Sequence, residues 1–404
     1  MTRIRPFKAV RPEKDKVALV VSRSYEDYSR EELEATLSFN PYSFLHIINP
    51  GYRYHHELNG KQRFKMVKNR YLEFREEQVL RQDEIPGFYI YEISDRFTRS
   101  YGILAAASID DYRNDVIKKH ESTLHEREVL FKNYLKTVGF NAEPVLLAYP
   151  DNESIDHLVD EVMVAEPEYN FSTNDRIQHK LWRIYDEERI RKIENAFNKV
   201  ESMYIADGHH RSASSCLLEQ EMSGESPGFG YFMSYLIPES QLRISDFNRM
   251  VKDLNGLTPE EFLIKLDEHF RIENRGITYY HPTKPHHFCM YLDGNFYSLY
   301  LRKTYEFSDE LSKLDAQILI KTILEPILGI GDLRSDKRIA YGCGKDNVIR
   351  MKDQIDNGKY SVGFNLFPVT IDQLKAIADD GLTMPPKTTY IEPKLKSGLT
   401  IYEF

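Results

Sequence analysis

The chain has 404 residues, of which 41% are hydrophobic and 29% charged, and its net charge is −9. This length is ample for a large core and exceeds the size at which one core usually stops growing, so two or three packed subdomains are expected. The acidic balance without a basic run argues against a nucleic-acid partner or a membrane surface.

The cysteine count and the lengths of the apolar runs indicate the cellular compartment of the protein. Three widely spaced cysteines, Cys216, Cys289 and Cys343, fit neither a disulfide framework nor a four-ligand zinc site. No segment reaches the roughly 18 apolar residues of a membrane-spanning helix, and the first ten residues do not resemble a signal peptide. We therefore expect a cytoplasmic location.

Strands and helices alternate along the whole chain, which predicts a mixed α/β or α+β sheet. Ser29 and Glu32 form a capping-box pattern, so a helix is predicted over residues 30–38. A second, mostly exposed helix is predicted over residues 60–82. The strands expected in this part span residues 17–21, 88–93 and 103–107.

The middle of the chain continues the alternation. Residues 166–174 are expected to be a flexible connection. The small residues from Ser212 onward are expected to open a helix that runs through residue 221. The other elements predicted here are a helix over residues 121–138 and strands over residues 144–149, 177–185 and 203–206.

In the last third, helices are predicted over residues 258–270, near 311–328 and over 371–379, with two strands around 288–301. The proline-rich residues 384–398 are expected to pack back over the body of the protein. These elements suggest three regions. They are an N-terminal region of residues 1–165, a core of residues 166–256 and a C-terminal region of residues 257–404.

The strongest chemical signal is Ile-Ala-Asp-Gly-His-His-Arg at residues 205–211. A glycine directly after a buried strand lets the backbone turn sharply and present free amides, which bind anions, at a helix start. The arginine and the two histidines add donors for phosphate or carboxylate. Asp207 lies where a magnesium ligand or a general base would be placed. The alternatives are that Asp207 only caps the helix, or that the histidine pair binds zinc.

A second constellation is Lys-Lys-His-Glu-Ser-Thr at residues 118–123, followed by Arg127. His120 and Glu121 would orient a nucleophilic hydroxyl or a metal-bound water, and Lys119 and Arg127 would hold a phosphate or carboxylate. The alternative is a charge-rich, N-capped surface helix.

Two weaker signals lie near the ends of the chain. Ser24, Tyr25 and Glu26 follow the first predicted strand, where they would line a polar pocket or form an ordinary turn. Lys387 and Lys394 lie in the proline-rich segment, which places side chains with less entropy loss than a free tail does. By default both would be surface lysines.

These motifs, taken in order, resemble the signature stretches of the DUF1015 family of bacterial and archaeal proteins. Two departures are visible. The early family motif Ala-Pro-Pro-Tyr-Asp-Val reads Ser-Arg-Ser-Tyr-Glu-Asp at residues 22–27, and Ser212 stands where an aromatic residue is common. The matching stretches are residues 5–7, 40–46, 117–123, 204–211 and 384–390.

The Asp-Gly-His-His-Arg turn also resembles the phosphate-binding turn of the ParB/sulfiredoxin superfamily, which includes nucleotide-binding partition proteins and free-serine kinases. The resemblance implies a ParB/sulfiredoxin-like nucleotide-binding core within a larger mixed-sheet α+β protein. It also implies phosphoryl chemistry, with Asp207 binding Mg²⁺ or positioning the acceptor. The donor phosphates would be held by Gly208, His210 and Arg211.

The leading hypothesis is a Mg²⁺-dependent kinase that converts free L-serine to O-phospho-L-serine, with ATP, ADP or pyrophosphate as donor. The alternatives are a nucleotide-binding switch without catalysis and a phosphatase of a small phosphoester. The expected partners are these small molecules, with a homodimer left open.

The candidate residues have three kinds of expected role, and Asp207 is also the expected Mg²⁺ ligand. The catalytic candidates are Glu121 as first base, Glu26 as second, His120 and Asp207. The phosphate-binding candidates are Gly208, His209, His210, Arg211, Ser212, Lys119, Thr123 and Arg127. The substrate-binding candidates are Ser24, Tyr25, Lys387 and Lys394.

Overall fold

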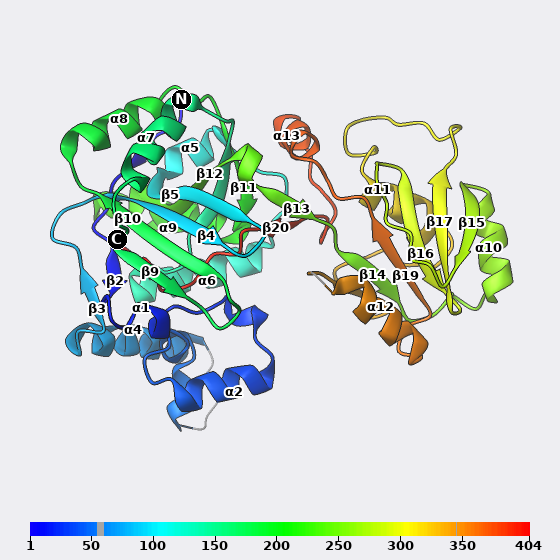
Figure 1. The fold of residues 1–404 in the computed structure, drawn as a ribbon, viewed down its shortest axis with the longest axis horizontal. Helices are drawn as coiled ribbons and strands as arrows, with labels where there is room; N and C mark the ends of the chain where they lie inside the picture. Colours follow the sequence, from blue (N-terminus) through cyan, green and yellow to red (C-terminus); the bar gives the residue numbers. More distant parts are fainter. Residues whose placement is uncertain (55–59, 345) are drawn as a thin grey trace. The chain divides into compact units, whose positions relative to one another are not determined.

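The computed structural model describes residues 1–54, 60–344 and 346–404, and divides the chain into two compact units (Figure 1). The first unit comprises residues 1–119, 123–242 and 393–404. The second comprises residues 243–392 together with residues 120–122. The division has two parts where three regions were expected, and its main boundary lies at residues 242–243 rather than near Gly256.

A nine-stranded sheet forms the centre of the first unit, in the order β6-β11-β8-β12-β5-β4-β10-β9, with β1 beside β5. Most neighbours are antiparallel, but β6 runs parallel to β11 and β8 runs parallel to β12. The strands are β1 (Ile4–Arg5), β4 (Phe88–Ser94), β5 (Arg99–Ser108), β6 (Ile117–Lys118), β8 (Val145–Tyr149), β9 (Tyr169–Ser172), β10 (Gln178–Ile184), β11 (Met203–Asp207) and β12 (Tyr231–Pro238).

Helices cover this sheet because their apolar residues share one core with alternate residues of the strands. The sheet contributes Phe88, Ile90, Ile103 and Leu147, among others, to that core. The helices that pack there are α5 (Ile109–Arg113), α7 (Glu153–Met163), α8 (Glu187–Phe197) and α9 (His209–Glu221).

A second cluster of buried residues joins both ends of the chain within the first unit. It includes Val10, Phe44, Tyr71, Phe140 and Ile401. The short strand β21 (Tyr402–Glu403) pairs with β7 (Phe140–Asn141), and β2 (Val10–Pro12) pairs with β3 (Leu80–Gln82). The helices that contribute residues to this cluster are α1 (Val17–Val20), α3 (Leu45–Ile48), α4 (Gly60–Glu76) and α6 (His125–Val138), and α2 (Arg30–Phe39) precedes α3 in the same unit.

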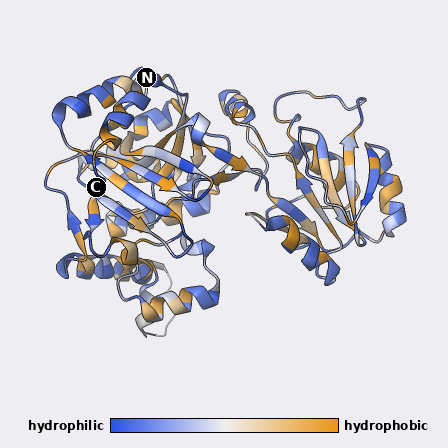
Figure 2. Cartoon of the chain, in the orientation of Figure 1, coloured by the Kyte–Doolittle hydropathy of each residue, from blue (hydrophilic) through white to orange (hydrophobic). Residues whose placement is uncertain are grey.

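The second unit is built on a six-stranded antiparallel sheet in the order β15-β17-β16-β19-β14-β18. Buried apolar clusters lie on the sheet, and its helices carry both hydrophobic and hydrophilic residues (Figure 2). Its strands are β14 (Asn248–Val251), β15 (Phe270–Gly276), β16 (His287–Leu292), β17 (Asn295–Leu301), β18 (Ile339–Gly342) and β19 (Val362–Leu366), and the ribbon β13 (Arg243–Ser245) pairs with β20 (Tyr390–Glu392). The helices are α10 (Pro259–Asp267), α11 (Asp315–Leu319), which continues as a short π-helix over Ile320–Leu324, α12 (Asn347–Asp356) and α13 (Ile371–Asp379).

The mixed α+β fold class is confirmed, as are the elements with strong local signals. The helix α2 begins with the predicted capping box: the Glu32 amide donates to Ser29 Oγ at 3.1 Å, and the Ser29 amide donates to the Glu32 carboxylate at 3.0 Å. The strands β4, β5, β8, β10 and β11 occupy the predicted apolar runs.

Several predicted elements are wrong in type or extent. The helix predicted over residues 60–82 ends at Glu76, and residues 80–82 form the strand β3. Residues 17–20 form the helix α1 rather than a strand, because a short apolar run fits either periodicity. Residues 166–174 contain β9, which is held by pairing with β10. Helix α6 begins at His125 instead of residue 121, and α9 begins at His209 instead of Ser212. Within the described residues, every helix is too short or too polar to cross a membrane.

A buried ion pair ties β2 to the main sheet. The Arg11 guanidinium donates to both Asp83 carboxylate oxygens, at 2.9 and 2.7 Å, and their side chains are 7% and 9% exposed. Tyr89, on β4, donates its hydroxyl to the same carboxylate. Removing one partner of such a pair leaves the other charge buried and uncompensated.

We expect Arg11→Met to lower the free energy of unfolding of the first unit by about 3–5 kcal/mol. Urea unfolding followed by fluorescence measures this unit alone, because the single tryptophan, Trp182, lies on β10. Arg191→Ala is the matched control, since Arg191 pairs with Glu187 at an exposed position, and it should cause no measurable change. If Arg11→Met were as stable as the wild type, the buried Arg11–Asp83 ion pair would not have the stabilising role given to it here.

Candidate functional site

The turn between β11 and α9 places a carboxylate beside a helix start. Gly208 has φ +104° and ψ 26°, a left-handed conformation that a residue with a Cβ adopts only with strain. A Cβ at this position would lie 3.1–3.2 Å from three atoms of the Arg211 guanidinium. Glycine therefore serves two purposes here: it permits the turn, and it lets Arg211 fold back over the backbone.

Two cations face the carboxylate of Asp207. Arg211 Nη2 lies 3.5 Å from Asp207 Oδ1, and Lys394 Nζ lies 3.5 Å from Asp207 Oδ2. Arg211 also donates from Nη1 to the carbonyl of Pro144 at 2.6 Å, which fixes the guanidinium plane. The Glu143 carboxylate lies 3.8 Å from the same Nη1.

The Asp207 side chain is 45% exposed, so solvent or a ligand reaches it. Desolvation by the surrounding chain acts to raise the pKa of Asp207, but Arg211, Lys394 and the Gly208 amide outweigh it and lower the pKa below 3.8. The ionised form is thus favoured in the folded state. Ionised Asp207 therefore stabilises the fold at every pH above the ordinary pKa of an aspartate. This stabilisation is lost as the pH falls through the lowered pKa of Asp207 in the folded protein.

The N-terminal motif lies near the same charges. The pKa of Asp27 is raised above its ordinary value, mainly because the carboxyl group is desolvated. Glu143 also raises this pKa, whereas Lys394 and Arg23 lower it. Asp27 ends a 3-10 turn, η1 (Tyr25–Asp27), so this turn lies within electrostatic range of the C-terminal lysine.

The C-terminal segment is held against the N-terminal motif by hydrogen bonds. Ser22 and Ser397 exchange backbone hydrogen bonds at 3.2 and 2.9 Å, and Ser397 Oγ donates to the Glu143 carboxylate at 2.6 Å. Residues from both ends of the chain therefore converge on the central turn.

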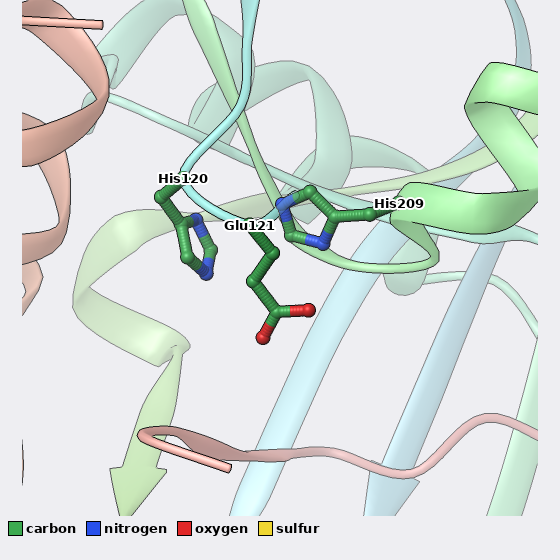
Figure 3. A group of neighbouring side chains, drawn as sticks. All are labelled: His120, Glu121 and His209. Carbon is green, nitrogen blue, oxygen red and sulfur yellow. The ribbon is translucent and has the colours of Figure 1, made fainter. Parts of the chain in front are cut away.

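The chain that leaves β6 reaches the same edge of the sheet, because β6 and β11 are parallel and Lys118 is paired with Tyr204. His120 and Glu121 follow β6, and His209 opens α9. One ligand atom from each of these three residues lies within 4.8 Å of the others (Figure 3). Burial lowers the pKa of His120 to about 4, so its ring is neutral at pH 7.

The two groups of residues suit different cations. Two imidazoles and one carboxylate are typical ligands of Mn, Fe, Co, Ni or Zn, whereas Mg²⁺ prefers oxygen ligands. Asp207 offers oxygen alone, and one carboxylate together with substrate phosphates is a common way to hold Mg²⁺. The donor set at Asp207 therefore fits the expected Mg²⁺.

Several other predicted site residues have defined contacts. Lys119 Nζ lies 4.8 Å from the centre of the Tyr112 ring, and Thr123 donates its hydroxyl to the carboxylate of Glu128. Ser212 is buried and donates to the Gly208 carbonyl, so its hydroxyl braces the turn.

The remaining predicted residues lie at the surface or in the other unit. Arg127, Tyr25 and Glu26 are exposed, and Ser24 precedes the η1 turn. Lys387 belongs to the second unit, where its ammonium lies 5.3 Å from the ring centre of Phe247. The predicted roles of all these residues stay predictions.

Sequence reasoning missed Glu143. Glu143 stands between β7 and β8, directly before Pro144, and no local motif marks it. Its position became evident only from its contact with Ser397 and its proximity to Arg211.

This α+β fold, with a strand–glycine–helix turn flanked by cations, defines a protein with a candidate anion site. The chain matches the family model described as protein of unknown function (DUF1015) over residues 4–317, and it belongs to that family. No curated protein matches the chain.

Three solved structures illustrate the similarity. A variant of a free serine kinase in complex with AMP has 13% identity and a TM-score of 0.39, with 75% of this chain and 93% of that chain covered. The same kinase with ADP has 13% identity and a TM-score of 0.38, with the same coverage. A conserved hypothetical protein from Pyrococcus furiosus has 12% identity and a TM-score of 0.36, with 73% and 95% covered.

We expect Gly208→Ala to weaken pyrophosphate binding at least about tenfold, because the new Cβ displaces the Arg211 guanidinium. Isothermal titration calorimetry measures the affinity. Gly224→Ala is the matched control: Gly224 has φ +86° and no atom within 4 Å of the new Cβ. Both variants should lose about 1–2 kcal/mol of stability from backbone strain. Equal pyrophosphate affinities for the two variants would contradict this role of Gly208.

Proposed function

We propose that the protein is a phosphotransferase that moves a phosphoryl group from ATP, ADP or pyrophosphate to the hydroxyl of a small hydroxy amino acid, with L-serine as the first acceptor to test. The observation that supports it is the turn at Gly208, where two cations, backbone amides and one accessible carboxylate meet. Phosphoryl transfer depends mainly on positioning and charge neutralisation, and these groups provide both.

In the proposed reaction the acceptor hydroxyl oxygen attacks the terminal phosphorus of the donor. The new O–P bond forms as the bridging P–O bond breaks, and the donor leaves with one phosphoryl group fewer. The hydroxyl proton passes to a carboxylate. Glu121 is the first candidate because it lies beside His209 at the start of α9, and Glu26 is the second.

The cations have distinct proposed roles. Arg211 and the amides at the start of α9 would hold the donor phosphates, and Lys394 would neutralise charge on the transferred group. Asp207 would hold Mg²⁺, which supplies further charge neutralisation at the phosphates when it is bound.

The direct test is ³¹P NMR of the purified protein with Mg²⁺ and L-serine, run separately with ATP, ADP and pyrophosphate. We expect a new O-phospho-L-serine resonance with one of the three donors. The resonance of that donor's product, which is ADP, AMP or phosphate respectively, should appear with it. A parallel run without any donor, starting from O-phospho-L-serine, detects a phosphatase. Nucleotide binding with no product from L-serine would contradict the kinase and indicate a nucleotide-binding switch.

We expect Asp207→Asn and Arg211→Ala each to lower kcat by more than about a hundredfold, since each removes a charge that acts on the transferred group. Two exposed residues supply matched controls. Asp115 lies at φ 58°, where asparagine is well tolerated, and Arg191 lies on α8. Asp115→Asn and Arg191→Ala should keep wild-type kcat, and all four variants should keep wild-type Trp182 fluorescence. Near-normal kcat in the first two variants would remove the turn from the reaction.

A further inference from the structure

An apolar cavity of about 320 Å³ lies next to the turn, within the first unit. Its volume falls in the range of small-molecule pockets, about 300–1,000 Å³. Aromatic side chains form much of its wall, and its polar lining residues are Arg63, Asn141, Glu143, Arg211 and Ser214. The apolar wall includes Phe44, Phe64, Leu130, Phe131, Tyr134 and Phe140.

Asn141 gives the cavity a buried side-chain amide whose nitrogen has no hydrogen-bond partner among the described residues. Asn141 lines the cavity and is only 7% exposed, and its Nδ2 atom is itself buried. A buried amide without a partner costs folding free energy, so such groups are rare unless something else satisfies them. A carboxamide both donates and accepts, which matches the edge of a heteroaromatic ring.

The cavity is continuous with the proposed phosphate site through shared residues. Arg211 lines the cavity and also faces Asp207, and Ser214 lines it from the next turn of α9. Glu143 lines it too and lies 3.8 Å from Arg211. A carboxylate at that point repels a phosphate but accepts hydrogen bonds from sugar hydroxyls.

We propose that this cavity binds the base of the phosphoryl donor, so that the donor is a nucleoside phosphate and not pyrophosphate. The inference rests on the proposed function and names the substrate class of the same site. The aromatic wall stacks on the planar base, Asn141 pairs with the base edge, and Glu143 accepts from the ribose hydroxyls. The phosphates then extend past Arg211 to the amides at the start of α9.

The acceptor does not suit this cavity. L-serine is small and polar throughout, so it would leave most of an apolar volume of this size unfilled and its own polar groups unpaired. A planar, apolar-faced ring with polar edges satisfies both the wall and the buried amide.

The test is calorimetric titration with AMP, ribose 5-phosphate and pyrophosphate. AMP and ribose 5-phosphate share the sugar and the phosphate and differ by the base, and pyrophosphate reports the turn alone. We expect AMP to bind at least about tenfold more tightly than ribose 5-phosphate. Asn141→Leu should weaken AMP about tenfold, the size expected for one buried hydrogen bond, and leave the other two ligands unchanged.

A second variant removes part of the wall instead of the amide. Phe131→Ala, at the half-exposed rim on α6, should also weaken AMP alone, and Phe97→Ala is the control because Phe97 is 80% exposed and does not line the cavity. Asn141→Leu should keep the wild-type Tm, because the amide has no partner to lose. If that variant fails to fold, Phe131→Ala carries the test.

Each outcome decides the inference. Selective loss of AMP affinity in Asn141→Leu or Phe131→Ala supports it. Equal affinities for AMP and ribose 5-phosphate, or AMP affinity untouched by both variants, overturn it. Pyrophosphate binding without any AMP binding overturns it and leaves the proposed function standing, whereas the absence of binding by all three ligands removes the proposed function as well.

Discussion

The carboxylate of Asp207 holds together two cations that come from different parts of the chain. Arg211 arrives from the following helical turn, and Lys394 from the C-terminal segment. That segment is itself fixed in the first unit by contacts on both sides of the chain: Lys396 pairs with Asp175 at 3.1 Å, and β21 pairs with β7. The position of Lys394 at the turn is therefore a consequence of how the last dozen residues return to the first unit.

The architecture of the sheet explains why the turn lies where it does. Since β6 and β11 are parallel, both strands deliver the chain that follows them to one edge. Helix α9 leaves that edge with Ser212, Ala213, Ser214 and Ser215 buried in succession, and small side chains of this kind let the helix backbone pack closely. Close packing holds Arg211 in reach of the Pro144 carbonyl, so the guanidinium is positioned before any ligand binds.

Local signals in the sequence predicted the parts of the site that local interactions build. The turn at Gly208 could be predicted because strand, glycine and helix start are adjacent in the chain, and the capping box of α2 for the same reason. The start of α6 could not be predicted, because the charge pattern over residues 121–124 suits a helix as well as it suits the loop that these residues form. Predicting an early start of α9 would have required knowledge that Gly208 adopts positive φ.

The non-local parts of the site left no comparable signal. Asn141 lines the cavity only because β7 pairs with a strand from the far end of the chain, and Glu143 meets Ser397 through the same return of the C-terminal segment. No spacing rule links residues so distant. The DUF1015 motifs marked the turn, the loop after β6 and two of the cavity residues, Phe44 and Arg211, yet they did not mark Asn141 or Glu143.

The charges at the turn balance one another before a ligand arrives. Asp207 carries one negative charge, and Arg211 and Lys394 carry two positive ones, with Glu143 near Arg211 as a further anion. In the proposed reaction, Asp207 would hold a divalent cation in place of its contacts with Arg211 and Lys394, and these two cations would then be free to bind the donor phosphates. Each charged group at the turn would then keep an oppositely charged partner. An anion without a cation would have to compete with Asp207 for Arg211 and Lys394, which is why the proposed donor carries its phosphates together with a divalent cation.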